Sequence, residues 1–255
     1  MLEDDMYTVD YTTYTNKGKR GVNEDSCGVA SFNDSYCFVV ADGLGGHGGG
    51  DVASSCAVDA VCGLFSKTGY TDHFFQDAFL NAQNSIITVQ QQAHKVSQMK
   101  TTLVILVVTP KKTYWAHIGD SRLYHWKKQQ LKEHTIDHSV PQMLVLSGEI
   151  KESEIRHHPD RNRLLRVLGV KGEQPRFECG KPLRNSGEHT YLLCTDGYWE
   201  LIDENAMTET LKCRNTLEEW IIGMNSHVIR NGENTEMDNY TAIAVRVKTK
   251  GLLGF

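Results

Sequence analysis

Acidic residues stand at the edges of apolar segments at four separate points of this 255-residue chain. These points are Glu24-Asp25, Asp42-Gly43, Asp196-Gly197 and Asp238-Asn239. One such pair alone would indicate only a turn, because Asp side chains favour turns by bonding to nearby backbone. Several carboxylates at the strand edges of one sheet repel one another and need a cation to offset their charge. The pattern therefore indicates a metal site.

The donor atoms of this site would all be oxygen, since no Cys or His stands at the matching positions. Oxygen ligands favour hard divalent cations, so we expect Mg²⁺ or Mn²⁺ rather than zinc or copper. Six glycines also follow Asp42 between Gly43 and Gly50, and glycine lets a ligand come close to the backbone.

The same glycine stretch fits a second class of site, the dinucleotide-binding loop. Residues 43–48 match G-x-G-x-x-G between a strand-like and a helical segment, which is the required context. However, the expected helix over 51–65 is followed by another helical pattern, and no second strand ending in an acid is there to hold a ribose. Asp42 would also repel a pyrophosphate. We therefore disfavour a nucleotide cofactor.

Strand-like segments dominate the chain, and short turns join most of them. This favours antiparallel sheets with helices outside, an α+β layered fold. Helical spacing of apolar residues predicts helices over 51–65, from about 71 onward, and over 217–228, and Gln90–Gln92 is expected at a solvent-exposed helix end. The charged, histidine-rich stretch 137–170 is expected to leave the core. The predicted strands cover residues 7–15, 27–32, 36–41, 102–108, 113–118, 123–126, 130–133, 190–195 and 240–247.

The overall composition is that of an ordinary globular protein, with 40% hydrophobic and 23% charged residues and a net charge of −5. No global basic field suggests nucleic acid or an anionic membrane as a partner, and no apolar run is long enough for a membrane span. The acidic start MLEDDMYTVD does not resemble a signal peptide, so we expect a cytoplasmic protein. The seven cysteines, without a C-x-x-C pair, are expected to be buried free thiols.

Eight short motifs occur in one order along the chain. They are RGVNEDS (20–26), VADGLGGHGGGDVAS (40–54), the pair Thr101-Thr102, HIGDSRLY (117–124), DHS (137–139), RVLG (166–169), CTDGYWE (194–200) and DNYTAIAV (238–245). In this order they resemble the metal-dependent serine/threonine protein phosphatases of type 2C, the PPM family, in its bacterial form. The resemblance extends over nearly the whole chain, from about residue 7 to 247.

The resemblance implies a central antiparallel β-sandwich flanked by helices on both sides, in α-β-β-α layers. It also implies that residues 1–255 form a single phosphatase catalytic domain, with a flap-like excursion at about 139–170 next to the active site. A centre of two Mn²⁺ or Mg²⁺ ions would lie at one end of the sandwich, and the family pattern allows a third ion.

The resemblance also implies a role for each acidic position. Asp42 would bridge both metals, and the Gly43 carbonyl would bind one of them. Asp196 and Asp238 would complete the shell of one metal.

The other metal would be held by Asp25 together with Glu24, partly through water. Asp120 is similar to the family's ligand for the third metal. Arg20 would hold the substrate phosphate, for which its planar guanidinium is better suited than a lysine.

The implied activity is hydrolysis of phosphoserine and phosphothreonine in proteins by a metal-activated water, with no cysteine nucleophile. Phosphorylated proteins would be the substrates of a monomeric enzyme that opposes a cognate serine/threonine kinase. The alternative is a non-catalytic relative of the same fold that only binds phosphoproteins. We disfavour it because all the required carboxylates and Arg20 are present.

Three positions depart from the family's usual pattern. Leu44 stands where many eukaryotic relatives carry a histidine that can protonate the leaving group; bacterial members usually have an apolar residue there, so activity is expected with the general acid unassigned. Lys100 replaces a usual glycine, and Asp51 replaces a more usual glutamate. The histidines interpreted as ordinary structural or surface residues are His47, His117 and His138.

Overall fold

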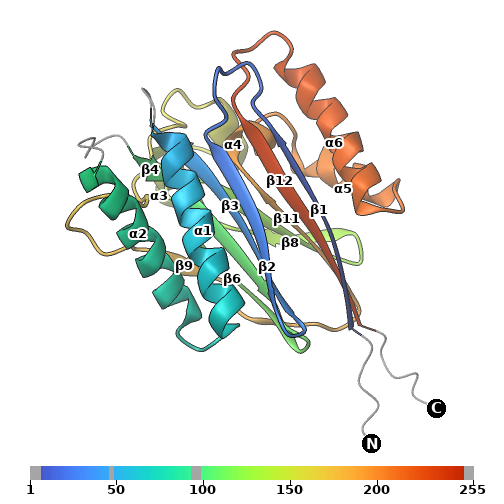
Figure 1. Cartoon of the computed structure of the whole chain (residues 1–255). Coiled ribbons are helices and arrows are strands. Elements are labelled where there is room, and N and C mark those ends of the chain that lie inside the picture. The colour runs from blue at the N-terminus through green and yellow to red at the C-terminus, as the bar shows by residue number, and fades with distance from the viewer. Residues whose placement is uncertain (1–6, 46–48, 93–98, 250–255) are drawn as a thin grey trace, which may run out of the picture.

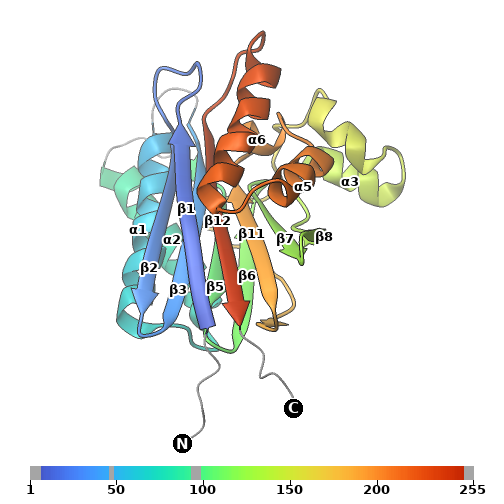
Figure 2. The same ribbon diagram turned by 90° about the vertical axis from the view of Figure 1, so that its right-hand side faces the viewer.

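Two antiparallel β-sheets pack face to face, and helices cover the outer face of each one (Figure 1 and Figure 2). The computed structural model describes residues 7–45, 49–92 and 99–249. Its layers follow the order α-β-β-α, so the predicted fold class is confirmed. The elements are β1 (Tyr7–Asn16), β2 (Asp25–Phe32), β3 (Ser35–Leu44), α1 (Gly50–Thr68), α2 (Phe74–Gln92), β4 (Lys100–Thr101), β5 (Leu103–Val108), β6 (Lys112–Ile118), β7 (Arg122–Lys127), β8 (Gln130–His134), α3 (Val140–Ser147), the 3₁₀ helix η1 (Glu152–His157), β9 (Glu178–Cys179), β10 (Leu183–Arg184), β11 (Glu188–Cys194), α4 (Asp196–Trp199), α5 (Glu204–Lys212), α6 (Leu217–Gly232) and β12 (Tyr240–Thr249).

The strand order of the first sheet is β1-β12-β11-β7-β8. The second sheet has the order β10-β6-β5-β3-β2, with β4 paired to β3 and β9 paired to β6. Helices α1 and α2 cover the second sheet, and α5 and α6 cover the first on the opposite side of the molecule (Figure 1). Neighbouring strands run antiparallel, as the short turns of the sequence predict.

The inner strands are buried on both faces, which explains their continuous apolar runs. On β3, Cys37, Val39 and Ala41 face the helices α1 and α2, while Phe38 and Val40 face the other sheet. A third apolar cluster lies between the first sheet and the helices α5 and α6. The sandwich is therefore held by three apolar layers, and its strand ends are free to carry polar residues.

The elements that the sequence did not predict are short. They are β4, β9, β10, α4 and α5. Helix α5 begins after Asp203, whose side chain accepts a hydrogen bond from the Ala206 N–H at 2.9 Å. Helix α2 begins at Phe74, later than expected, because the preceding turn is closed by a hydrogen bond from the Phe74 N–H to the Thr71 carbonyl (3.0 Å).

The expectation that Gln90 lies at an exposed helix end is wrong. Its side chain is fully buried, and its amide Nε2 donates hydrogen bonds to the carbonyls of Met99 and Gly169, both at 2.8 Å. Only Gln91 and Gln92 of this run are exposed. The last turns of α2 therefore anchor two other segments of the chain.

The chain leaves the sheets between β8 and β9, where the sequence predicts an excursion. This stretch contains α3 and η1, and an isolated β-bridge between Ser139 and Leu164 closes its base. The Ser139 hydroxyl caps α3 by accepting a hydrogen bond from the Gln142 N–H. The role of this stretch as a flap stays a prediction.

All seven cysteines are free thiols, as expected. Cys37 and Cys194 are buried in apolar strands, but the expectation of burial is wrong for Cys179 and Cys213. These two are exposed because Cys179 lies on the short strand β9 and Cys213 ends helix α5. Within the described residues, no helix has both the length and the apolar character needed to cross a membrane.

Candidate active site

The acidic positions of the sequence gather at one edge of the two sheets because the strands that carry them are antiparallel. Asp42 lies near the end of β3, and Asp25, the first residue of β2, is its partner in the register. Asp120 lies in the turn between β6 and β7, Asp196 follows β11, and Asp238 precedes β12. Antiparallel pairing places the end of one strand beside the start of the next. Five acids far apart in the sequence therefore lie at the same end of the sandwich.

The backbone of Asp42 is held by the predicted threonine pair. The Asp42 N–H donates to the Thr102 hydroxyl (3.0 Å), and the Asp42 carbonyl accepts hydrogen bonds from the Thr102 N–H (2.9 Å) and the Thr101 hydroxyl (2.8 Å). The Thr102 hydroxyl also shares a 2.7 Å hydrogen bond with that of Ser121. These bonds fix the end of β3 from which the Asp42 carboxylate projects.

Three backbone segments meet at Gly43 and Gly50. A Cβ atom at Gly43 would overlap the carbonyl oxygen of Gly50 and lie 2.5 Å from that of Glu24. A Cβ atom at Gly50 would lie 2.7 Å from Glu24 Oε1. Glycine is therefore required at both positions for the end of β3, the start of α1 and the segment before β2 to approach this closely.

A cavity of about 520 Å³ opens at this edge of the sandwich, and we call it the acidic cavity. The predicted site residues that line it are Arg20, Glu24, Asp42, Gly43, Asp120, Asp196 and Asp238. Asp25 is not in the lining. It is 7% exposed, and its Oδ2 accepts a hydrogen bond from the Thr195 hydroxyl at 2.9 Å.

The departures from the family pattern also fall around the acidic cavity. Leu44 and Asp51 line it, and Leu164 reaches it from the end of the excursion. Lys100 is the register partner of Leu44 but lines a different, smaller cavity. His47 lies outside the described residues.

The carboxylates at this edge raise one another's pKa. Burial raises the pKa of Asp42 well above its usual range, and the nearby charges of Asp196, Asp25 and Asp120 raise it further. The pKa of Asp25 rises to about 8, first through burial and then through Asp196 and Asp238, although hydrogen bonds from threonine hydroxyls oppose the shift. Burial and neighbouring carboxylates also raise the pKa of Asp196 and of Asp120. At neutral pH this cluster is stabilised by binding protons or cations.

The donor atoms of the cluster fit a hard divalent cation, because they are carboxylate and carbonyl oxygens. Asp25 Oδ1 is buried and has no hydrogen-bond partner among the described residues, so it is free to accept from a water or a cation's hydration shell. The side chains do not converge on one point by themselves. In the described ranges, no three Asp, Glu, His or Cys side chains form a group that could hold an ion.

Arg20 is the one arginine or lysine among the described residues that line the acidic cavity. Its Nη2 lies 2.7 Å from Asp238 Oδ2, and the two side chains are 54% and 40% exposed. Asn239 holds the loop of Arg20 in place: its amide donates to the carbonyls of Lys17 (2.9 Å) and Val22 (3.0 Å). The sequence placed Asn239 next to Asp238 but carried no signal for this anchoring role.

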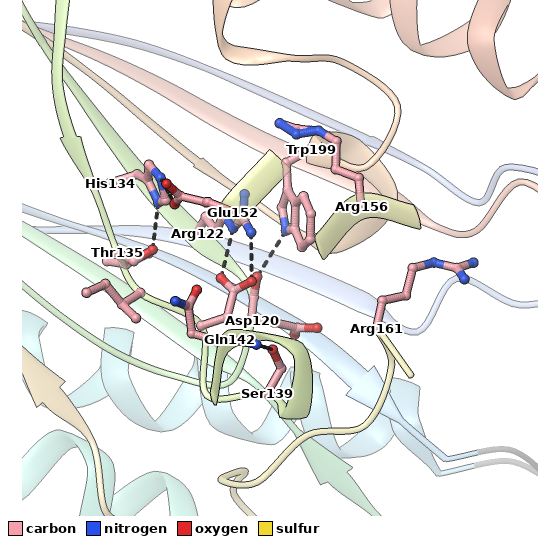
Figure 3. Close-up of polar contacts among 12 residues, drawn as sticks. Asp120, Arg122, His134, Thr135, Ser139, Gln142, Glu152, Arg156, Arg161 and Trp199 are labelled. Carbon is pink, nitrogen blue, oxygen red and sulfur yellow. Dashed lines mark hydrogen bonds and ion pairs between the residues drawn. The ribbon is translucent and has the colours of Figure 1, made fainter. Parts of the chain in front are cut away.

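A buried arginine supports the wall of the cavity behind Asp120. Arg122 is 3% exposed and donates to both carboxylate oxygens of Asp137, at 2.8 and 2.7 Å. Its guanidinium lies 3.5 Å from the centre of the Trp199 ring, whose indole N–H donates to the Asp120 carbonyl at 3.0 Å (Figure 3). These residues belong to motifs quoted above, but no motif shows that they meet.

His117 and His138 are buried structural residues, as predicted. Their rings stack with centroids 4.7 Å apart. His138 Nδ1 accepts a hydrogen bond from the Gly119 N–H (3.1 Å), and His117 Nε2 lies 2.8 Å from the Ile136 carbonyl. Burial lowers the pKa of both imidazoles, so both are neutral at pH 7.

The arrangement can bind a phosphate monoester. Its oxygen-lined cavity attracts divalent cations, and a half-exposed guanidinium at the rim offers a planar pair of donors to a phosphate. The family model for protein phosphatase 2C matches residues 15–227. The serine/threonine phosphatase stp of Listeria monocytogenes is 34% identical over 213 residues, which cover 80% of this chain and 84% of the relative. The chain belongs to the protein phosphatase 2C family.

Solved structures confirm the fold. The serine/threonine phosphatase Stp1 from Staphylococcus aureus superposes with a TM-score of 0.84 at 25% identity, covering 96% of each chain. The catalytic domain of the phosphatase PstP, in complex with two manganese ions, superposes with a TM-score of 0.80 at 24% identity, over 95% of this chain and 100% of the other. The four-layer sandwich described above is thus the architecture of these enzymes.

Proposed function

We propose that this protein hydrolyses phosphoserine and phosphothreonine in proteins and that the reaction takes place in the acidic cavity. Membership of the protein phosphatase 2C family and the serine/threonine phosphatases among its relatives support the activity. The observation that carries the location is the shared lining: Arg20 stands on the same cavity wall as Asp42, Asp196 and Asp238. A cation-binding edge and a phosphate-binding group are thereby within one substrate's reach.

Dependence on Mn²⁺ or Mg²⁺ is general to the family. When bound, such cations lower the pKa of a water and neutralise charge on a phosphate. We assign the first ion to Asp42, the Gly43 carbonyl, Asp196 and Asp238, following the family pattern. Asp238 contacts Arg20 through Oδ2, and both side chains are partly exposed, so an exchange of partners between Arg20 and an ion would cost little.

The second ion is assigned to Asp42 and to Asp25 together with Glu24, partly through water. The buried, unpartnered Oδ1 of Asp25 supports this role. Asp120 is proposed for a third ion. Trp199 holds the Asp120 backbone through its carbonyl, at a position from which the Asp120 side chain lines the acidic cavity.

The chain's own groups suffice to bind and orient the substrate phosphate once the cations are present. Arg20 is paired with Asp238 through Nη2 and is half-exposed, and its planar guanidinium would donate to two phosphate oxygens. None of the cysteines among the described residues lines the acidic cavity, and the fully buried thiols have raised pKa values, so a phosphocysteine step is not part of the proposal.

We further propose that residues 1–255 act as a single catalytic domain, as a monomer, on substrates of a cognate serine/threonine kinase in the cytoplasm. The free state of all seven thiols supports a reducing compartment. The likeness to whole phosphatase structures over 96% of the chain supports the single domain.

Asp42→Asn tests the site directly. With a phosphothreonine peptide and Mn²⁺ or Mg²⁺, we expect the wild type to turn over and the variant to lose at least about a hundredfold in kcat, because a group that positions the charge-stabilising cations is lost. Neither protein should turn over in EDTA. Asp34→Asn, in the exposed β2–β3 turn, is the matched control. Near-normal turnover by Asp42→Asn in saturating metal would refute the site, and no turnover by folded wild type would favour a relative that only binds phosphoproteins.

A further inference from the structure

A second cavity of about 210 Å³ lies beside the acidic cavity, and the described residues of its walls include three cations. It is lined by Gln83 of α2, Lys100 of β4, and residues of the 164–176 segment that include Arg166, Glu173 and Arg176. We propose that this Lys100 cavity binds an anionic side chain, a second phosphate or a carboxylate, that stands a few residues from the phosphorylated residue of a protein substrate. The proposal rests on the phosphatase activity proposed above.

The charges in the Lys100 cavity are only partly neutralised. Arg166 lies 2.8 Å from Glu178 Oε1, but Lys100 and Arg176 form no salt bridge with any residue that the structure describes. Among the described residues of the lining, Glu173 is the one acid. The stretch 156–176 holds six Lys or Arg residues against two acids, in a chain whose net charge is −5. A local excess of positive charge on a negative protein favours an anionic ligand at this place.

Buried hydrogen bonds hold the walls of this cavity in place. Gln83 donates to the Val170 carbonyl and accepts from the Gly169 N–H, both at 2.7 Å. The Gln90 side-chain amide donates hydrogen bonds to the carbonyls of both Met99 and Gly169. The backbones of Thr101 and Leu168 also pair with each other: the Leu168 N–H donates to the Thr101 carbonyl (2.9 Å), and the Thr101 N–H donates to the Leu168 carbonyl (3.3 Å). Lys100 and the 164–176 segment are therefore held side by side before any ligand binds, which lowers the entropy cost of binding.

The Lys100 cavity lies within reach of a peptide bound at the acidic cavity. Leu164 lines both cavities, and Lys100 is the register partner of Leu44, which lines the acidic one. Leu44 stands two residues beyond Asp42, about 7 Å along the strand. Its partner strand is about 5 Å away. Lys100 is thus roughly 9 Å from Asp42 at the backbone, which an extended peptide spans in about three residues.

Lys100 is also the position at which this chain departs from the family's usual glycine. A glycine there would leave the cavity without one of its two unpaired cations. The proposed anion preference therefore depends in part on a residue at which this chain departs from that pattern.

The test is a series of phosphothreonine peptides, each of which carries a single glutamate. The position of the glutamate runs from four residues before to four residues after the phosphoresidue, and each peptide has a control with glutamine at the same position. A second series carries phosphoserine in place of glutamate. At one or two positions, we expect wild-type kcat/KM to be about fivefold higher with glutamate, as for a partly exposed ion pair, and higher still with phosphoserine. Lys100→Gln/Arg176→Gln should reduce this ratio to less than about twofold.

Lys171→Gln is the matched control, because Lys171 is exposed on the same segment but does not line the cavity. It should keep the wild-type ratio. Arg176→Gln alone, at an exposed position, should halve the preference without risk to folding. A wild type with no preference at any position, or a double variant that keeps the preference, would overturn the proposal.

Binding is measured in parallel, by fluorescence anisotropy of peptides with a non-hydrolysable phosphonate in place of the phosphate. The same ratios are expected for Kd. A third outcome is that no peptide is hydrolysed, but the wild type has a lower Kd for the glutamate peptides and the double variant does not. This outcome would refute the proposed activity and support the anion site.

Discussion

Arg20 illustrates how a single residue can serve two partners at a metal site. In this structure its guanidinium neutralises Asp238, and the proposed reaction needs it on the substrate phosphate. Because half of its surface is exposed, the ion pair with Asp238 stabilises the fold little. Its contribution is expected in substrate binding.

Arg20→Ala should therefore raise KM for a phosphothreonine peptide by about tenfold while kcat falls by less than about threefold, since Arg20 contacts the phosphate already in the ground state. Steady-state kinetics in saturating Mn²⁺ measure both. Lys17→Ala, a neighbouring exposed lysine, should leave both constants unchanged. A loss confined to kcat would contradict a role in ground-state binding.

At the scale of residues, the sequence locates the acids well. An Asp that directly follows a buried apolar strand must lie at the end of that strand, at the edge of the sheet. The sequence does not reveal that Asp25 lies beneath the acidic cavity rather than in its wall. It also cannot reveal the stack of Arg122 on Trp199. That contact depends on the relative positions of two strands and a short helix, which the packing of the whole core determines.

At the scale of elements, Gln90 shows that a polar helix end can be an internal anchor. It lies on the face of α2 that meets Met99 and Gly169, whereas Gln91 and Gln92 are exposed to solvent. The helical spacing of Phe79, Ala82 and Ile86 continues to position 90 and separates it from positions 91 and 92, but the polar side chain of Gln90 favoured an exposed position.

Gln90→Ala should lower the free energy of unfolding by about 2 kcal/mol, because two donated hydrogen bonds are lost and two buried carbonyls are left without their donor. Urea unfolding followed by circular dichroism measures it. Gln91→Ala is the adjacent control and should change stability by less than about 0.5 kcal/mol. Equal effects of the two substitutions would show that the buried amide is not an anchor.

The long strands and helices were predictable because each buries one or two apolar faces. The short strands β4, β9 and β10 were not, since two-residue strands exist only through their partners. Strand β4 matters most among them, because it sets Lys100 opposite Leu44.

At the scale of the whole molecule, the acid cluster links stability to pH and to metal. Asp25 keeps its proton in the folded protein up to about pH 8 but loses it near its ordinary pKa of 3.8 in the unfolded chain. Between these values unfolding releases a proton, so a rise in pH favours unfolding. The stabilising contribution of this carboxyl is complete below about pH 4 and is lost as the pH approaches 8.

In EDTA, the free energy of unfolding of the wild type should therefore fall more steeply between pH 5 and 8 than that of Asp25→Asn, by at least about 1 kcal/mol over the range. Urea titrations at several pH values measure the slope. Mn²⁺ at about a hundred times its Kd should restore about 2.7 kcal/mol to the wild type. Asp34→Asn should keep the wild-type slope, and a slope unchanged in Asp25→Asn would show that this carboxyl is not the titrating group.

The contact between Gly43 and Gly50 has a consequence for how the protein can diverge. Any side chain at either position would push the end of β3 away from the start of α1, and the acids with it. Behind the Lys100 cavity, Gly169 is constrained in the same way, because a Cβ atom there would overlap the Met99 carbonyl oxygen, but Lys100 and Arg176 themselves project from a short strand and a loop. We therefore expect substitutions at Lys100 and Arg176 to change which substrates the protein prefers while the acidic cavity keeps its geometry.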